Sequence, residues 1–209
     1  MAKKKIIRLG VGGPVGSGKT SLIEQLTVRL IADKVKVGII SNDVVTKEDA
    51  VRLQRRLCDE LKLLPHDLVV GVETGGCPHT AVREDPSINI DALALMEERH
   101  PELDMIILEG GGDNITITFS PAVADFFVYV IDVAGGEKYP RKNGLGIIQS
   151  DFLVINKKDL APYVAADLNV MKRDAQEIRK RKPFFFTNCK TGEGIAELEE
   201  QIKRTVLLM

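Results

Sequence analysis

Residues 13–20 have the types and spacing of a loop that could hold phosphate groups. Gly13, Gly18, Lys19 and Thr20 fit the pattern Gly-x-x-x-x-Gly-Lys-Ser/Thr. The glycines let backbone N–H groups converge on phosphates, Lys19 can reach the terminal phosphates, and the Thr20 hydroxyl can ligate Mg²⁺. The pattern predicts a nucleoside triphosphate site with Lys19 as a catalytic residue. Its expected binding residues are Gly13, Pro14, Val15, Gly16, Ser17, Gly18, Lys19, Thr20 and Ser21.

A second motif, Asn156-Lys157-Lys158-Asp159, follows an apolar run and could recognise a base. A carboxylate at Asp159 can accept two hydrogen bonds, from N1–H and the 2-amino group of guanine. Adenine supplies neither, so Asp159 would be left unpaired with ATP. We expect Asn156 to brace the loop and the Lys157 stem to lie along the base. The alternative is a solvated polar turn. Downstream of the first motif, the spacing favours GTP.

Acidic residues follow two other apolar runs. Glu109 precedes three glycines, and Asp113 comes directly after them. We expect an acid near Mg²⁺ here, with backbone that approaches the γ-phosphate closely. Asp43 follows another apolar run and is a candidate for binding Mg²⁺ or for positioning water; a carboxylate that only solvates its turn is the alternative. Glu109, Asp113 and Asp43 are therefore the expected catalytic acids.

The segment Cys77-Pro78-His79 carries two metal-ligand side chains at positions i and i+2. In extended backbone both would point to the same side, and Pro78 keeps Cys77 out of a helix. Zn²⁺ requires four ligands, and so does a tetragonal Ni²⁺ site. A twofold dimer would double this pair to two thiolates and two imidazoles. The alternative is a small buried cysteine beside a loop histidine.

Short apolar runs alternate with helical stretches, which predicts an α/β fold. Alternation of this kind gives a mostly parallel sheet with helices on both faces, and ligands bind beyond the carboxyl ends of its strands. No linker divides residues 1–209, so we expect a single domain. The expected strands are 6–11, 36–40, 67–70, 105–108, 126–131, 152–155 and 184–186, and the expected helices are 20–32, 47–61, 88–99, 168–180 and 195–207.

Composition limits which classes of binding partner and which cellular compartment we expect for this chain. Lys and Arg number 29 against 30 for Asp and Glu, a net charge of -1. We therefore expect neither nucleic acid nor a membrane as a partner. The three cysteines are odd in number and far apart, which favours a reducing compartment, the cytoplasm. The longest apolar runs are too short to span a bilayer.

Four passages together resemble the UreG family of urease accessory GTPases: residues 11–20, 42–49, 72–85 and 154–162. The third passage is the diagnostic one. The resemblance implies a P-loop GTPase of the dimerising class whose GTP-bound, Mg²⁺-dependent dimer holds one Ni²⁺ between Cys77 and His79 of both subunits. It further implies that hydrolysis releases nickel to apo-urease, assisted by the accessory proteins UreF, UreH (also called UreD) and UreE. Zn²⁺ suits the same ligands, and sequence does not separate the two metals.

The chain departs from that family's pattern at two places. Gly110 stands where a serine is usual, and residues 143–146 replace a usual Gly-Gly-Pro-Gly. No obvious water-positioning glutamine follows Glu109, so slow hydrolysis is expected. The hydrogenase nickel-insertion GTPase HypB is an alternative, although its usual Cys-rich N-terminus is not present here. A regulatory GTP switch without metal transfer and a small-molecule kinase are further alternatives.

Overall fold

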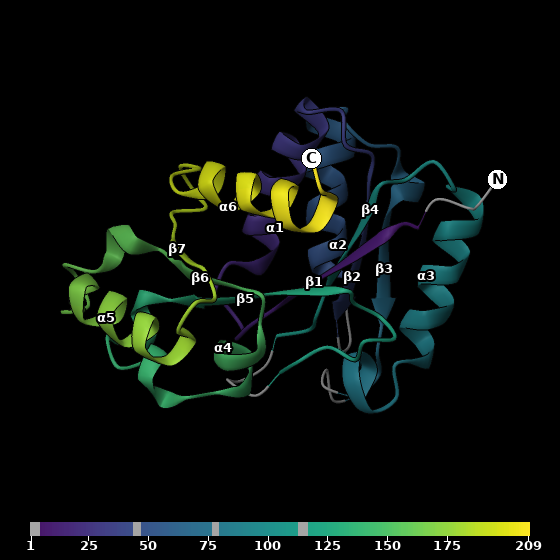
Figure 1. Ribbon diagram of the computed structural model, residues 1–209. Helices are drawn as coiled ribbons and strands as arrows, with labels where there is room; N and C mark the ends of the chain where they lie inside the picture. The colour runs from purple at the N-terminus through teal and green to yellow at the C-terminus, as the bar shows by residue number, and fades with distance from the viewer. Residues whose placement is uncertain (1–4, 44–46, 77–79, 113–116) are drawn as a thin grey trace.

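The computed structural model describes residues 5–43, 47–76, 80–112 and 117–209, and within them the chain forms one seven-stranded parallel sheet (Figure 1). The strand order is β3-β2-β4-β1-β5-β6-β7, so β1 lies at the centre. Every pair of neighbouring strands in this sheet is parallel. The strands are β1 Ile7–Gly12, β2 Val37–Asp43, β3 Val69–Glu73, β4 Met105–Glu109, β5 Phe126–Asp132, β6 Phe152–Asn156 and β7 Phe184–Phe186.

Helices cover both faces of this sheet, as the alternation of strands and helices predicts. Register shows the division: Glu109 of β4 points to the face that carries Thr20 of α1, whereas Gly38 of β2 lies beside Met96 of α3 on the opposite face. The C-terminal α6 packs beside α1 (Figure 1). The helices are α1 Lys19–Ala32, α2 Glu48–Leu53, α3 Ser87–Arg99, α4 Leu145–Gln149, α5 Leu168–Arg179 and α6 Ile195–Ile202.

Burial explains why the strands read as almost continuous apolar runs. All five residues of β4 and all five of β6 are buried, as expected for parallel strands covered on both faces. Helix α1 buries Leu22, Ile23, Leu26 and Leu30 against the same core. The apolar core therefore fixes the strand ends from which the polar loops leave.

The expected strands and helices are all present, but one strand and two helices differ in detail. Asp67 was expected in a strand, which is wrong: residues His66–Leu68 form a 3-10 turn and β3 begins at Val69. The expected helix 47–61 is α-helical only to Leu53 and continues as a π-helix over Gln54–Glu60. Likewise α6 continues as a π-helix over Lys203–Leu207.

The short elements that were not expected include α4 and a π-helical turn. Helix α4 begins just after Asn143, which has a left-handed φ of 56°, and Gly144. A π-helical turn spans Thr80–Glu84. Of the helices in the described part of the chain, none is long and apolar enough to cross a membrane.

Candidate functional site

The glycine loop between β1 and α1 has a geometry that requires glycine at two positions. Gly18 precedes α1 with a φ of 99°, and Gly13 has a φ of 147°. A side chain at Gly13 would overlap the Val130 carbonyl, and one at Gly18 would overlap the Asn156 amide. The loop therefore lies directly against the ends of β5 and β6, with the N-terminus of α1 opening from it.

A cavity of about 250 Å³ lies at this helix N-terminus and has the chemistry of a phosphate site. Lys19 is mostly buried and its Nζ donates a 3.3 Å hydrogen bond to the Pro14 carbonyl. Helix N-termini present backbone N–H groups and a partial positive charge to anions. The cavity is lined by Val15, Gly16, Gly18, Lys19, Thr20, Ser21, Asp43, Asp49, Arg52 and Gly112.

Glu109 lies at the floor of the site, fully buried between two hydroxyl groups. Thr20 Oγ1 donates to Glu109 Oε1 at 2.7 Å, and Ser41 Oγ donates to Glu109 Oε2 at 2.7 Å. Burial raises the pKa of the Glu109 carboxyl, and the two hydroxyl hydrogen bonds oppose that rise. The carboxylate thus orients both hydroxyls of the site.

Two further carboxylates stand on the cavity wall, and one of them was missed by sequence reasoning. Asp43 ends β2, as expected. Asp49, which the sequence suggested only as part of a helix start, lies with its Oδ1 3.1 Å from Thr20 Oγ1. The expected catalytic Asp113 lies outside the described residues.

This set of oxygens fits Mg²⁺. The ion takes oxygen ligands in nucleotide sites, usually one or two carboxylates together with substrate phosphates and water. Thr20 Oγ1, Asp49 and Asp43 line one cavity and supply that kind of ligand. Among the described residues, no group of three or more His, Cys, Asp and Glu side chains is placed to hold a metal ion.

Asn156 ties the second motif to the glycine loop. Its Nδ2 donates to the Ser17 carbonyl at 2.9 Å, and its Oδ1 accepts hydrogen bonds from Thr187 Oγ1 at 3.1 Å and Cys189 N at 3.0 Å. The side chain is buried. Asn156 therefore holds its own loop against the glycine loop and the loop after β7, as expected from its place in the motif.

Lys157 and Asp159 follow Asn156 in the chain. Lys157 has a left-handed φ of 58°, and its Nζ donates to Gly16 O at 2.5 Å and to Asp132 Oδ2 at 3.0 Å. Asp159 is exposed. Both line a second cavity, of about 270 Å³, together with Gly18, Ser21, Asn156, Leu160, Asn188, Cys189 and Lys190.

Cys189 in this cavity is a structural thiol. It is buried, and burial raises its pKa from 9.0 to about 11, while a 3.8 Å contact with Thr187 Oγ1 opposes the rise. A thiol with a raised pKa is a poor nucleophile at neutral pH.

The two cavities share Gly18 and Ser21, and this overlap joins them into one elongated site. One end has Lys19 and Thr20, and the other end has Asp159. A nucleoside triphosphate has the same division between phosphates and base. The arrangement can therefore hold such a ligand with its base against Asp159 and its ribose near Gly18 and Ser21.

Cys77 and His79 lie outside the described residues, but the chain on both sides of them is described. Thr74, before them, donates from its N to the Asp43 carbonyl at 2.9 Å. After them, Arg83 Nη1 donates to Thr118 Oγ1 at 2.6 Å and Ser120 N donates to Val82 O at 2.8 Å. The chain before the segment is therefore hydrogen-bonded to Asp43 of the phosphate cavity, and the chain after it is hydrogen-bonded to residues 118–120.

The residues adjoining this segment also share a cavity of about 250 Å³. Gly76 and Thr80 lie on its wall with Asp85 and Ser87. Asn89 of α3 donates to the Ala81 carbonyl at 2.7 Å and is fully buried, so the π-helical turn after the segment is fixed to α3.

Sequence reasoning missed Ser41, Asp49 and Arg52 as members of the phosphate site. Ser41 lies opposite Glu109 because β2 and β4 are neighbours, a pairing between strands that are not consecutive in the chain. Asp49 and Arg52 come from α2. The available signal for Asp49 and Arg52 was their place within ten residues after Asp43, the expected Mg²⁺ candidate.

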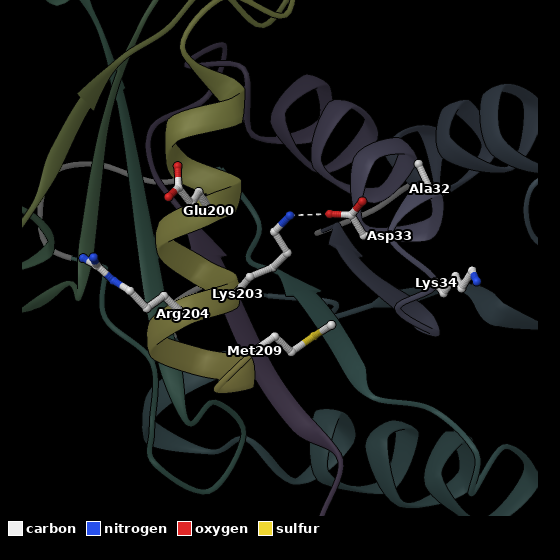
Figure 2. Close-up of a pocket in the computed structure, with 7 residues that line it drawn as sticks. All are labelled: Ala32, Asp33, Lys34, Glu200, Lys203, Arg204 and Met209. Atoms are coloured by element: carbon white, nitrogen blue, oxygen red, sulfur yellow. Dashed lines mark hydrogen bonds and ion pairs between the residues drawn. The ribbon is translucent and has the colours of Figure 1, made fainter.

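A larger cavity, of about 580 Å³, lies near the C-terminal end of α1 and contains none of the expected site residues (Figure 2). Helix α1 has 14 residues, so this cavity is about 20 Å from the glycine loop. Lys203 points toward Asp33 across it and also contacts Glu199. Its wall is made by Ala32, Asp33, Lys34, Glu200, Lys203, Arg204 and Met209.

Comparisons with known proteins agree with the geometry. Residues 7–186 match the nucleotide-binding domain of the CobW/HypB/UreG family. The chain is 62% identical over 199 residues to a urease accessory protein, UreG 2, of Methylorubrum extorquens, covering 95% of this chain and 91% of that protein.

Two solved structures share the fold. The hydrogenase maturation factor HypB of Archaeoglobus fulgidus aligns with a TM-score of 0.71 and 25% identity, over 95% of this chain and 89% of that chain. HypB of Helicobacter pylori in complex with nickel aligns with a TM-score of 0.74 and 20% identity, over 97% of this chain and 89% of that chain. At that identity the second likeness supports the fold alone.

Proposed function

The chain belongs to the CobW/HypB/UreG family, and we propose that it is a GTP-hydrolysing nickel metallochaperone that helps to insert nickel into apo-urease. The observation that carries this proposal is the joined cavity, with Lys19 and Thr20 at one end and Asp159 at the other. The urease accessory relative is 62% identical, whereas the hydrogenase maturation factor is 25% identical. Urease maturation is therefore better supported than hydrogenase maturation.

We propose that the glycine loop and Lys19 bind the β- and γ-phosphates, with the guanine base held by Asp159. The backbone N–H groups of the loop and the Lys19 ammonium would neutralise phosphate charge. Asp159 is exposed at the cavity wall and can accept both guanine donors. Asn156, which is bonded to Ser17 O, keeps the two halves of the site in register.

Mg²⁺ would be held by Thr20 with Asp43 or Asp49 and the nucleotide. When bound, the ion supplies Lewis-acid stabilisation of charge on the transferring phosphoryl group. The Thr20 hydroxyl has one proton and two lone pairs, so it can donate to Glu109 while a lone pair faces the ion. Glu109 keeps that orientation fixed. Asp43 and Asp113 are our candidates for orienting the attacking water, and we expect slow hydrolysis.

We propose that Ni²⁺ is bound by Cys77 and His79 from two chains of a GTP-dependent homodimer. One chain offers two ligands, and a twofold axis brings two more. Zn²⁺ fits the same donors. UreF, UreH (UreD), UreE and apo-urease are the proposed partners. We place the protein in the cytoplasm, where its cysteines stay reduced.

The oligomeric state tests this proposal directly. Light scattering of the purified chain is measured with a non-hydrolysable GTP analogue and Mg²⁺, with and without Ni²⁺, for the wild type, Cys77→Ala and His79→Ala. We expect a nickel-dependent dimer for the wild type only. His66→Ala is the matched control, because His66 is exposed and pairs with Asp59. It should dimerise normally.

Two results would overturn the metal-transfer proposal: a dimer that forms equally without nickel, or a Cys77→Ala variant that still dimerises with nickel. Either result would favour a GTP-dependent regulatory switch.

A further inference from the structure

The structure points to Arg52 as a residue that binds the α- and β-phosphates of the nucleotide. Arg52 lies on α2, and sequence reasoning gave it no role. The inference rests on the proposed nucleotide binding and adds to it a phosphate ligand outside the glycine loop.

The place of Arg52 in the joined cavity identifies which phosphates it faces. Arg52 lines the phosphate cavity, and its Nη2 donates to Ser21 Oγ at 2.8 Å. Ser21 is one of the two residues that this cavity shares with the base cavity. A nucleotide must cross from base to terminal phosphates at that shared point. Its ribose and α-phosphate therefore pass beside Ser21, within reach of the Arg52 guanidinium.

The guanidinium has donors left for this task. Arginine carries five N–H donors in a planar fork that suits phosphate oxygens. In the structure one Arg52 donor is used by Ser21, and Nη2 lies 3.5 Å from Glu24 Oε2. The side chain is 54% exposed. A phosphate that enters the cavity can thus bind Arg52 at two oxygens without first removing it from a buried site.

The ion pairs around Glu24 make the release of Arg52 inexpensive. Glu24 also pairs with Arg56, whose Nε lies 3.1 Å from Glu24 Oε1. If Arg52 turns toward a phosphate, Glu24 keeps Arg56 as its partner. Glu24 is then not left without a cation. An unpaired carboxylate there would oppose the movement.

Electrostatics favour the same movement. The lining of the phosphate cavity contains two cations, Lys19 and Arg52, and two carboxylates, Asp43 and Asp49. A triphosphate carries several negative charges, and Lys19 faces its terminal end. Arg52 is the other cation in this lining, and its guanidinium would offset negative charge at the start of the phosphate chain.

This position predicts a distinctive binding pattern. The α- and β-phosphates are common to GTP and GDP, so loss of Arg52 weakens both nucleotides by a similar factor. A charge-assisted, two-point contact predicts a loss of about ten-fold in affinity.

The experiment measures dissociation constants of fluorescent GTP and GDP for the wild type, Arg52→Ala, Arg52→Lys and Arg56→Ala. Arg56→Ala is the matched control, since Arg56 lies in the π-helical turn that continues α2 and also pairs with Glu24 but does not line the cavity. We expect the affinity of Arg52→Ala for both nucleotides to fall by about ten-fold, and the affinity of Arg52→Lys to fall less. The affinity of Arg56→Ala should stay within about two-fold of the wild type.

Circular dichroism of each variant checks that it is folded, and a salt titration adds a second readout. Affinity of the wild type should fall more steeply with salt than that of Arg52→Ala, because one phosphate contact is missing in the variant. Unchanged affinity in folded Arg52→Ala, an equal loss in Arg56→Ala, or a loss confined to GTP would each overturn the assignment. If the wild type itself binds neither nucleotide, it is the proposed function that fails.

Discussion

The Thr20 hydroxyl donates a 2.7 Å hydrogen bond to the Glu109 carboxylate, although 89 residues separate them in the chain. The contact joins the first turn of α1 to the end of β4 beneath the phosphate cavity. It depends on β1 and β4 being neighbours, because Glu109 then lies opposite Val11, just before the glycine loop. The hydroxyl of Thr20, which lines that cavity, is thereby fixed by a carboxylate that is fully buried.

Glu109→Gln is expected to lower Mg²⁺-dependent GTP hydrolysis by at least about ten-fold, while nucleotide affinity without Mg²⁺ stays within about two-fold of the wild type. The amide keeps the shape and one acceptor oxygen but removes the charge next to Thr20. Phosphate release is measured at saturating GTP, with Glu60→Gln as a surface control. Full activity in Glu109→Gln would exclude a role for this carboxylate in hydrolysis.

Asp159→Asn is expected to exchange guanine for xanthine as the preferred base. The asparagine amide offers a donor where the carboxylate offered only acceptors, which suits the 2-oxo group of xanthine better than the 2-amino group of guanine. GTP affinity should fall by about a hundred-fold and xanthosine triphosphate affinity should rise. Competition binding measures both. A variant that keeps its preference for GTP would remove Asp159 from base recognition.

Arg83→Ala is expected to weaken nickel-dependent dimerisation with little effect on GTP affinity. The Arg83–Thr118 hydrogen bond links the turn after Cys77 and His79 to the segment after the Glu109–Gly112 loop, and it lies outside the phosphate cavity. The variant should need roughly three- to ten-fold more nickel for half-maximal dimer.

A double-mutant cycle separates this link from a general loss of stability. If the hydrogen bond is the link, Arg83→Ala, Thr118→Val and the double variant should show similar nickel requirements. Additive effects of the two substitutions would show that they act independently, and the link would then have to be assigned elsewhere.

Alkaline pH should destabilise the protein partly through Cys189. Burial raises the pKa of this thiol from 9.0 to about 11, so the unfolded chain loses the proton first as pH rises. The associated stability is present below pH 9 and is lost as the pH approaches the folded value. Between pH 8 and pH 10 the free energy of unfolding should fall by about 1 kcal/mol through this group.

Urea denaturation at the two pH values measures that fall, with Cys189→Ala for comparison. Cys58 is buried too and its pKa is also raised, so it remains in both proteins as an internal reference. Between the two pH values, the free energy of unfolding of the wild type should fall by about 1 kcal/mol more than that of Cys189→Ala. Equal losses would mean that the Cys189 thiol does not titrate differently in the folded chain.

The strands were predictable because parallel strands buried on both faces read as apolar runs, and each of the seven has such a run. The error at Asp67 arose because Leu68, Val69 and Val70 extend an apolar pattern across a 3-10 turn. Helix α4 was missed because it has only five residues, too few for a periodic signal. The π-helical ends of two helices have no pattern that distinguishes them from α-helix.

The parts of the candidate site that are formed by consecutive residues were predictable. The parts that are formed by contacts between distant elements were not. The glycine loop and Asp159 follow a strand, and Asp43 and Glu109 are each the last residue of one. In contrast, Ser41 reaches Glu109 only through the β2–β4 pairing, and Arg52 reaches Ser21 from a separate helix. Residue types and spacing do not contain those tertiary contacts.

The central place of β1 in the strand order separates two kinds of specificity. Asp159 follows β6 on one side of β1, and the segment with Cys77 and His79 follows β3, which forms the other edge of the sheet. Substitutions in one half need not disturb packing in the other, since sites without shared contacts behave additively. Natural variation can therefore change the metal ligands and the base-recognition residues of such a protein one at a time, while β1 between them stays unchanged.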